Sequence, residues 1–155
     1  MLEKNKITKT FTEKTPAVLG EADTPVTRFK AEVFRLINSE RKKNSGSELK
    51  AMEILGVMAD KRAKEAAALF QHTRPDGTRC FTIFAENSLK YRAAGENLAY
   101  GYKTPETLVA AWMNSEGHRK NILDPDFTYA GIGYVVNEKG TLYCSTVFYT
   151  PRAGN

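Results

Sequence analysis

The spacing of apolar residues changes along this chain, and this change limits the possible folds more than any other feature. In one long stretch, apolar side chains recur at intervals of three and four, as on one face of a long helix. They are Met52, Leu55, Ala59, Ala63, Ala66 and Phe70. Other segments are rich in β-branched and aromatic residues and predict strands at residues 80–84, 95–99, 130–136 and 142–149. Helices that precede and interrupt a few strands indicate an α+β fold.

A first helix is predicted between Val26 and about Lys43. Its apolar residues also recur at helical spacing: Phe29, Val33, Leu36 and Ile37. The polar residues 42–46 then stop it. The long helix described above ends directly before residues 72–77, a turn sequence that contains Pro, Asp and Gly. His72 is therefore expected just beyond a helix end.

A third helix is predicted to begin at Pro105, because Thr104 is a favourable N-cap and proline suits the first helical position. One face of this helix is expected to carry Leu108, Ala111, Trp112 and Ser115, with the tryptophan in the core. Residues 118–123 predict a short further helix with His118 in its first turn. Residues 137–140 predict a hairpin turn, so the last two strands are expected to be antiparallel.

Length and composition suit one folded domain. The chain has 155 residues, of which 41% are hydrophobic and 26% charged, and this is enough for one hydrophobic core. Residues 1–25 are rich in Thr, Lys and Glu and show neither a helical nor a strand period. We expect a tether or linker at residues 1–25 and the folded domain at residues 26–155.

Two classes of protein are disfavoured by the distribution of apolar and charged residues. The longest apolar run, residues 108–113, has six residues, whereas a bilayer-spanning helix needs about 20. The net charge is +5, but only residues 41–43 form a tight basic run. We therefore expect neither a membrane-spanning helix nor a nucleic-acid partner. Residues 1–5 lack the apolar core of a secretory signal, which leaves an intracellular chain or one whose signal was removed as alternatives.

The two cysteines, Cys80 and Cys144, allow two interpretations. They are too few for a disulfide scaffold and lack the paired spacing of a structural zinc site. One bridge between them would stabilise the fold by about 4 kcal/mol on the chain-entropy model. The alternative is a pair of buried free thiols.

The histidines are the remaining candidates for chemistry. The chain has no His-Glu-x-x-His, Gly-x-Ser-x-Gly or Walker motif, and residues 131–133 lack the third glycine of a dinucleotide-binding loop. Its two histidines, His72 and His118, both lie at predicted helix boundaries rather than on apolar faces. These positions make them candidates for a shared site.

Three sequence motifs in order resemble one known family. They are residues 70–77 (FQHTRPDG), 95–99 (GENLA) and 112–123 (WMNSEGHRKNIL). Together they resemble the bacterial branch of the CAP superfamily, the SCP-like domains related to cysteine-rich secretory and pathogenesis-related proteins. The resemblance extends in order from about residue 26 to residue 149.

This resemblance implies a fold and a cleft. The fold is an α-β-α sandwich with a small, mainly antiparallel central sheet. The cleft is lined by two histidines and two acidic residues, of which His72, Glu96 and His118 match three, while the fourth position falls on Ser115. A second carboxylate would have to come from another acidic residue, and the candidates are Glu116, Glu86 and Asp76.

The matched residues suit three alternative roles. Two neutral imidazoles, His72 and His118, can hold zinc or another divalent metal and leave a position for water. Without a metal, Glu96 can accept a histidine ring proton and so prepare a general base. The same residues can instead form a hydrogen-bond network that only specifies the fold. Nearby, Arg74 and Arg119 are either solvated surface arginines or groups that orient an anionic ligand.

Two functions follow from these roles. The first is a secreted or cell-surface binding domain whose cleft, formed by His72, Glu96, Ser115 and His118, takes a metal ion or a small ligand. The family resemblance leaves a lipid, a cell-wall component and a protein as further candidate partners. The alternative is an extracellular hydrolase, peptidase-like, that uses metal assistance or a general base, with His72, Glu96 and His118 as catalytic candidates. Ser115 lacks an acidic partner that would make it a nucleophile.

Overall fold

A four-stranded sheet forms the centre of the molecule. The structure, a computed structural model, describes residues 22–154. The strands are β1 (Lys50–Ala51), β2 (Tyr91–Tyr100), β3 (Tyr129–Val136) and β4 (Leu142–Pro151), in the order β1-β3-β4-β2. β4 pairs antiparallel with both β3 and β2, while β1 is parallel to β3. β2 is therefore an edge strand of a mainly antiparallel sheet.

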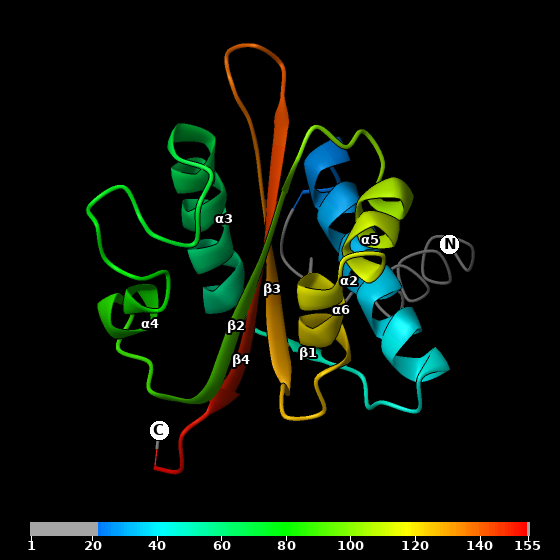
Figure 1. The fold of residues 1–155 in the computed structure, drawn as a ribbon, viewed down its shortest axis with the longest axis vertical. Helices are drawn as coiled ribbons and strands as arrows, with labels where there is room; N and C mark the ends of the chain where they lie inside the picture. The colour runs from blue at the N-terminus through cyan, green and yellow to red at the C-terminus, as the bar shows by residue number, and fades with distance from the viewer. Residues whose placement is uncertain (1–21, 155) are drawn as a thin grey trace, which may run out of the picture.

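Helices cover both faces of this sheet and make three layers (Figure 1). α2 (Pro25–Lys43), α5 (Pro105–Met113) and α6 (Glu116–Leu123) cover one face. α3 (Glu53–Ala68) and α4 (Thr82–Glu86) cover the other. The expected α-β-α sandwich is confirmed.

Strand β4 separates two apolar cores. Phe148 packs in the core under α2, α5 and α6, whereas Val147 and Tyr149 pack in the core under α3 and α4. Successive side chains of a strand point to opposite faces, so a strand between two helical layers is buried on both. Trp112 is only 1% exposed and donates its Nε1 proton to the Leu98 carbonyl at 3.1 Å, which confirms its predicted place in the core.

Local signals set the helix ends as predicted. The Thr24 side chain accepts a hydrogen bond from the Thr27 N–H, and Pro25 is the first residue of α2. Thr104 caps α5 in the same way, and Pro105 follows it. Both residue pairs satisfy a backbone N–H that would otherwise lack a partner and preset the helical φ.

Close contact between α3 and β3 depends on two glycines. A Cβ atom at Gly131 would overlap the backbone of Leu55, and one at Gly133 would overlap the backbone of Ala59. Ser145 of β4 donates to the Ala59 carbonyl at 2.6 Å. The small residues on both surfaces therefore let α3 lie directly on the sheet.

A buried arginine joins the first helix to the segment after α6. Arg41 donates through NH1 to the carbonyls of Ile122 and Asp124, each at 2.8 Å, and through NH2 to the Phe127 carbonyl at 3.2 Å. These groups lie near the C-terminal end of α6, where helix carbonyls lack intrahelical partners. Arg41 therefore positions α6, which carries His118.

Two predictions about secondary structure were wrong. Residues 80–84 are not a strand, since α4 (Thr82–Glu86) covers most of them. A short apolar run does not distinguish a strand from a buried helical turn, and here Ile83 and Phe84 are both buried. Ser115 does not share a face of α5, because α5 ends at Met113 and Ser115 is the N-cap residue of α6.

The remaining predictions concern the hairpin, the cysteines, the membrane and the N-terminal segment. Residues 137–140 form the predicted hairpin turn. Cys80 and Cys144 are free and buried, so the disulfide alternative is wrong for this structure. No helix within residues 22–154 combines the length and apolarity that a bilayer crossing requires. Most of the predicted tether at residues 1–25 lies outside the described residues.

Candidate functional site

Glu96 lies at the centre of the candidate site, on edge strand β2. Its carboxylate side chain is 3% exposed. Arg62 of α3 donates to it twice, from Nε to Oε2 at 2.6 Å and from NH2 to Oε1 at 2.9 Å. A buried carboxylate needs such a partner, because an unpaired charge in the interior is costly. Arg62 therefore fixes the orientation of the Glu96 carboxylate.

His72 is the third residue of this cluster, after Glu96 and Arg62. Its Nδ1 lies 3.0 Å from Glu96 Oε1, and its side chain is 61% exposed. Because the carboxylate can only accept, Nδ1 carries the proton in the neutral ring, and Nε2 keeps a lone pair for a ligand. The His72 backbone is also held, since its carbonyl accepts from the Cys80 N–H at 3.0 Å and the neighbouring Gln71 carbonyl accepts from Arg62 at 2.9 Å.

His118 approaches the same edge strand from the opposite helical layer. It lies in the first turn of α6, and its carbonyl accepts from the Asn97 side chain at 3.1 Å. Asn121 donates to the Asn97 side-chain oxygen at 2.9 Å and to the Glu96 carbonyl at 3.2 Å. Neighbouring residues of β2 point to opposite faces, so Glu96 meets α3 while Asn97 meets α6.

The His118 ring is half-buried and lies beside Trp112, with ring centroids 6.4 Å apart. Burial lowers the pKa of His118 below its usual value, and electrostatic repulsion from the nearby His72 lowers it further. The neutral imidazole that a metal ligand or a base requires is therefore favoured at neutral pH. Within residues 22–154, no hydrogen bond joins the His118 ring to His72 or Glu96.

A chain of alternating charges continues from Arg62 toward α4. Glu65 accepts from Arg62 NH1 at 2.8 Å and from Arg74 NH2 at 2.8 Å. Arg74 also donates to Glu86 at 2.6 Å. Burial raises the pKa of Glu65, but hydrogen bonds from Arg74 and Arg62 outweigh this effect and hold the pKa below its usual value. Arg74 is 3% exposed, so it is neither a surface arginine nor available to an anionic ligand, whereas Arg119 is exposed.

The other predicted carboxylates do not join the cluster. Glu86 is paired with Arg74 and Lys61. Asp76 accepts from Thr78 in its own turn, and Glu116 is exposed at the start of α6. Ser115 is half-buried and its side chain makes no capping hydrogen bond.

Sequence reasoning missed three members of the site: Arg62, Glu65 and Cys80. The ligand atoms of His72, Cys80 and Glu96 all lie within 4.8 Å of one another, so this group could hold a metal. Burial, and then the charge of Glu96, raise the pKa of the Cys80 thiol to about 12, which keeps it protonated. One signal was available, because Arg62 lies three residues after Ala59 on the stripe that predicted a buried helix face.

The arrangement offers two imidazoles beside edge strand β2, and the carboxylate of Glu96 lies behind one of them. Among the described residues, the group whose ligand atoms all lie within 4.8 Å of one another is His72, Cys80 and Glu96, and it does not include His118. Glu96 serves as the partner that orients His72 rather than as a ligand, because Arg62 already binds both of its oxygens. Without a metal, the same hydrogen bond makes His72 Nε2 a candidate base.

Curated relatives of this chain come from Bacillus subtilis (strain 168). The uncharacterized protein YkwD is 37% identical over 149 residues, which cover 91% of this chain and 57% of YkwD. The uncharacterized membrane protein YlbC is 46% identical over 48 residues, 31% of this chain and 14% of YlbC. The chain therefore spans about half the length of YkwD and a small part of YlbC.

Solved structures share the fold. An extracellular protein with an SCP domain from Bacillus anthracis superposes with a TM-score of 0.71 at 24% identity, over 84% of this chain and 45% of that protein. An outer surface protein from Borrelia burgdorferi gives 0.71 at 20% identity, over 77% of this chain and 90% of that protein. Manganese-bound Ac-ASP-7, an Ancylostoma-secreted protein, gives 0.53 at 12% identity, over 82% of this chain and 72% of that protein.

A model of the family described as the cysteine-rich secretory protein family, CAP, matches residues 34–149. This match includes both histidines, Glu96 and all of the sheet except its last two residues. The chain belongs to the CAP, or cysteine-rich secretory protein, family.

Proposed function

We propose that this chain is an extracellular or cell-surface domain whose cleft binds a divalent metal ion, zinc or another, through His72 and His118. The observation that carries this proposal is the 3.0 Å contact between His72 Nδ1 and Glu96, backed by the Arg62 clamp. A histidine ligand typically donates its other ring proton to such a carboxylate. The location outside the cell is supported by the extracellular and outer-surface proteins that share the fold.

Calorimetric titration of the chain with zinc and with manganese tests this proposal. We expect binding of one ion at about pH 7.5, above the usual imidazole pKa of about 6.5. His72→Ala/His118→Ala should abolish it, whereas the control Ser47→Ala, at an exposed position outside the site, should leave it unchanged. Cys80→Ser separates the two possible ligand sets, and it should also leave binding unchanged. No binding to the unaltered chain, or binding that needs Cys80 but not His118, would contradict the proposal.

The cleft also has an aromatic neighbour that suits an organic ligand. Phe70, two residues before His72, contacts the ring of Tyr100 with centroids 4.7 Å apart, and Tyr100 stacks on Tyr143 at 5.5 Å. Phe70 and Tyr100 are both exposed. A small ligand, a lipid, a cell-wall component or a protein side chain held at the histidines would find apolar surface here.

A second candidate function is hydrolysis, with His72 as general base and Glu96 as its orienting group. The observation that favours it is the same hydrogen bond, which leaves His72 Nε2 free to take a proton from water. Peptide and ester libraries, assayed with and without added zinc, test this activity. Turnover should fall at least about 100-fold in His72→Ala. Full turnover in that variant would exclude this role for His72.

A further inference from the structure

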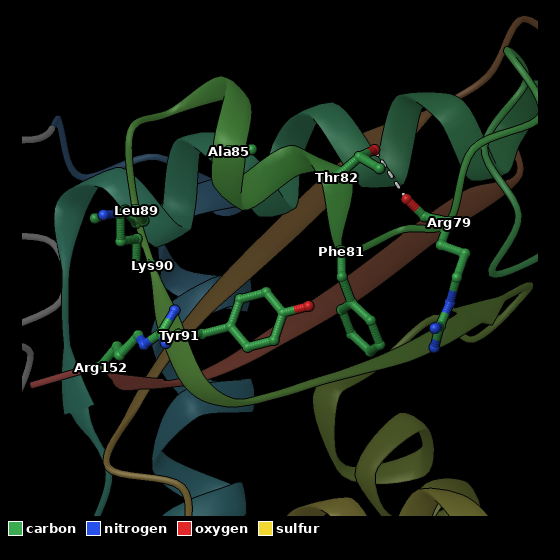
Figure 2. Close-up of a pocket in the computed structure, with 8 residues that line it drawn as sticks. All are labelled: Arg79, Phe81, Thr82, Ala85, Leu89, Lys90, Tyr91 and Arg152. Carbon is green, nitrogen blue, oxygen red and sulfur yellow. Dashed lines mark hydrogen bonds between the residues drawn. The ribbon is translucent and has the colours of Figure 1, made fainter.

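A second pocket lies away from the histidine cleft, beside α4 (Figure 2). It has a volume of about 500 Å³ and is formed by the start of α4, the start of β2 and the residue that follows β4. None of its lining residues is shared with the His72–Glu96–His118 site. No acidic residue lines it, and three of its residues are cationic: Arg79, Lys90 and Arg152.

Two aromatic rings form the floor of this pocket. The rings of Phe81 and Tyr91 lie side by side, with centroids 6.0 Å apart and planes 54° apart (Figure 2). Tyr91 also packs on Phe84 at 5.1 Å, and Phe84 is buried against Tyr149 of β4. Tyr91 is nevertheless 40% exposed. The floor is therefore an open aromatic surface that the core holds in place.

Two arginines flank these rings. Figure 2 shows Arg79 beyond Phe81 and Arg152 on the opposite side of Tyr91. The Arg79 guanidinium carbon lies 5.4 Å from the centroid of the Phe81 ring. The backbones of both arginines are fixed, since Thr82 donates to the Arg79 carbonyl at 2.9 Å and the Arg152 N–H donates to the Lys90 carbonyl at 3.1 Å.

Arg79 and Arg152 differ from Arg62 and Arg74, the arginines near the histidine cleft, in their ion-pair partners. Arg62 and Arg74 are buried and neutralised by carboxylates. Within residues 22–154, neither Arg79 nor Arg152 lies within ion-pair distance of a carboxylate. Asp76, three residues before Arg79, accepts from Thr78 in its own turn, and Glu86 is paired with Arg74 and Lys61. The pocket thus combines an aromatic floor with two guanidinium groups that no carboxylate of the described residues neutralises.

We propose that this pocket binds a small organic anion that carries a carboxylate or a phosphate on an aromatic or short acyl body. The apolar body packs against Phe81, Tyr91 and Leu89. The anionic group is bound by the guanidinium group at one end of the rings, that of Arg79 or that of Arg152, because guanidinium forms paired hydrogen bonds with both carboxylates and phosphates. Burial of an apolar body together with a few placed polar contacts is the usual design of a small-molecule site.

Binding of phenyl phosphate and of benzoate to the full chain, followed by NMR shifts and calorimetry, tests this site. We expect saturable binding of at least one of them at millimolar concentration. Inorganic phosphate supplies only the anionic group, and benzyl alcohol supplies only the aromatic body. Each should bind at least about tenfold more weakly. Arg79→Gln/Arg152→Gln should weaken binding at least about tenfold. These arginines are exposed, so this variant is expected to fold.

Two controls separate this site from general charge effects and from the histidine cleft. Arg92→Gln removes an exposed arginine of β2 that faces Asp126, and it should leave binding unchanged. His72→Ala/His118→Ala should also leave it unchanged, so that failure of the metal proposal does not affect this test. Absence of saturable binding, equal weakening in Arg92→Gln, or shifts that map to the histidine cleft would overturn the proposal.

Discussion

At the scale of single residues, Arg62 organises the candidate site. Its side chain is 0% exposed, and it donates to Glu96, to Glu65 and to the Gln71 carbonyl. One guanidinium thus holds the carboxylate behind His72 and the loop on which His72 lies. No spacing rule could reveal this pair, because Arg62 and Glu96 are 34 residues apart and meet only in the folded chain.

Loss of Arg62 should be costly. Arg62→Met leaves the buried Glu96 without its partner, and we expect the free energy of unfolding to fall by about 3–5 kcal/mol. Urea unfolding measures the difference. The control Arg28→Met removes an exposed pair with Asp23 and should change stability by less than about 1 kcal/mol. Similar losses in both variants would show that the buried pair of Arg62 has no special stabilising role.

Cys80 should be unreactive despite its position near His72. Its pKa of about 12 leaves almost no thiolate at pH values near 8, and the thiolate is the reactive form. We expect iodoacetamide to modify Cys80 far more slowly in the native chain than in the urea-unfolded chain, as measured by peptide mass spectrometry. Cys144 is an internal comparison, because burial raises its pKa as well. Equal native and unfolded rates at Cys80 would contradict this prediction.

At the scale of elements, sequence reasoning succeeded where the signal is local. Thr104 followed by Pro105 defines a helix start within one turn, and the structure confirms it. The prediction of a strand at residues 80–84 was wrong because the burial of these residues comes from contacts with distant strands, which override a weak local preference. The two-residue strand β1 escaped prediction because its pairing with β3 joins segments about half the chain apart.

The contact between α3 and β3 gives a test at this scale. Gly133→Ala places a methyl group against the backbone of Ala59, and we expect a loss of at least about 1–3 kcal/mol in urea unfolding. Gly56→Ala is a matched control within α3, where a Cβ atom meets nothing within 4 Å. The control should be stabilised by about 0.5–1 kcal/mol, because alanine favours helix over glycine. A neutral Gly133→Ala would show that the two elements can separate freely.

At the scale of the whole molecule, the ion-pair chain from Glu96 to Glu86 should make stability sensitive to acid. The pKa of Glu65 is lower in the folded than in the unfolded state, so the unfolded state binds more protons as the pH falls. Its stabilising effect is complete above the usual pKa of about 4.3 and is lost as the pH falls through the folded value.

Urea unfolding across this pH range checks the prediction. Glu65→Gln should be less stable than the unaltered chain at neutral pH and should lose less of its remaining stability on acidification. Glu116→Gln, at an exposed position in α6, should follow the unaltered chain. Identical pH profiles for Glu65→Gln and the unaltered chain would contradict the role assigned to Glu65.

The candidate site could be predicted in outline by resemblance but not by spacing. The family motifs placed His72 and Glu96 in one cleft, and the structure puts them 3.0 Å apart. Glu86 and Asp76 were suggested as the second carboxylate of the cleft, but they do not join it. Glu86 pairs with Arg74, and Asp76 accepts from Thr78 in its own turn. Which charges pair with which depends on how α3 lies on the sheet, and that follows from packing across the whole domain.

The two histidines approach β2 from different helical layers. His72 follows α3 in one layer and His118 begins α6 in the other, with separate apolar cores behind them. We expect amide hydrogen exchange to report two protection levels if the two layers open separately. If the proposed ion binds to both histidines, we expect it to slow amide exchange in α6 and in residues 69–80 together, because one ion would then join segments from two different layers.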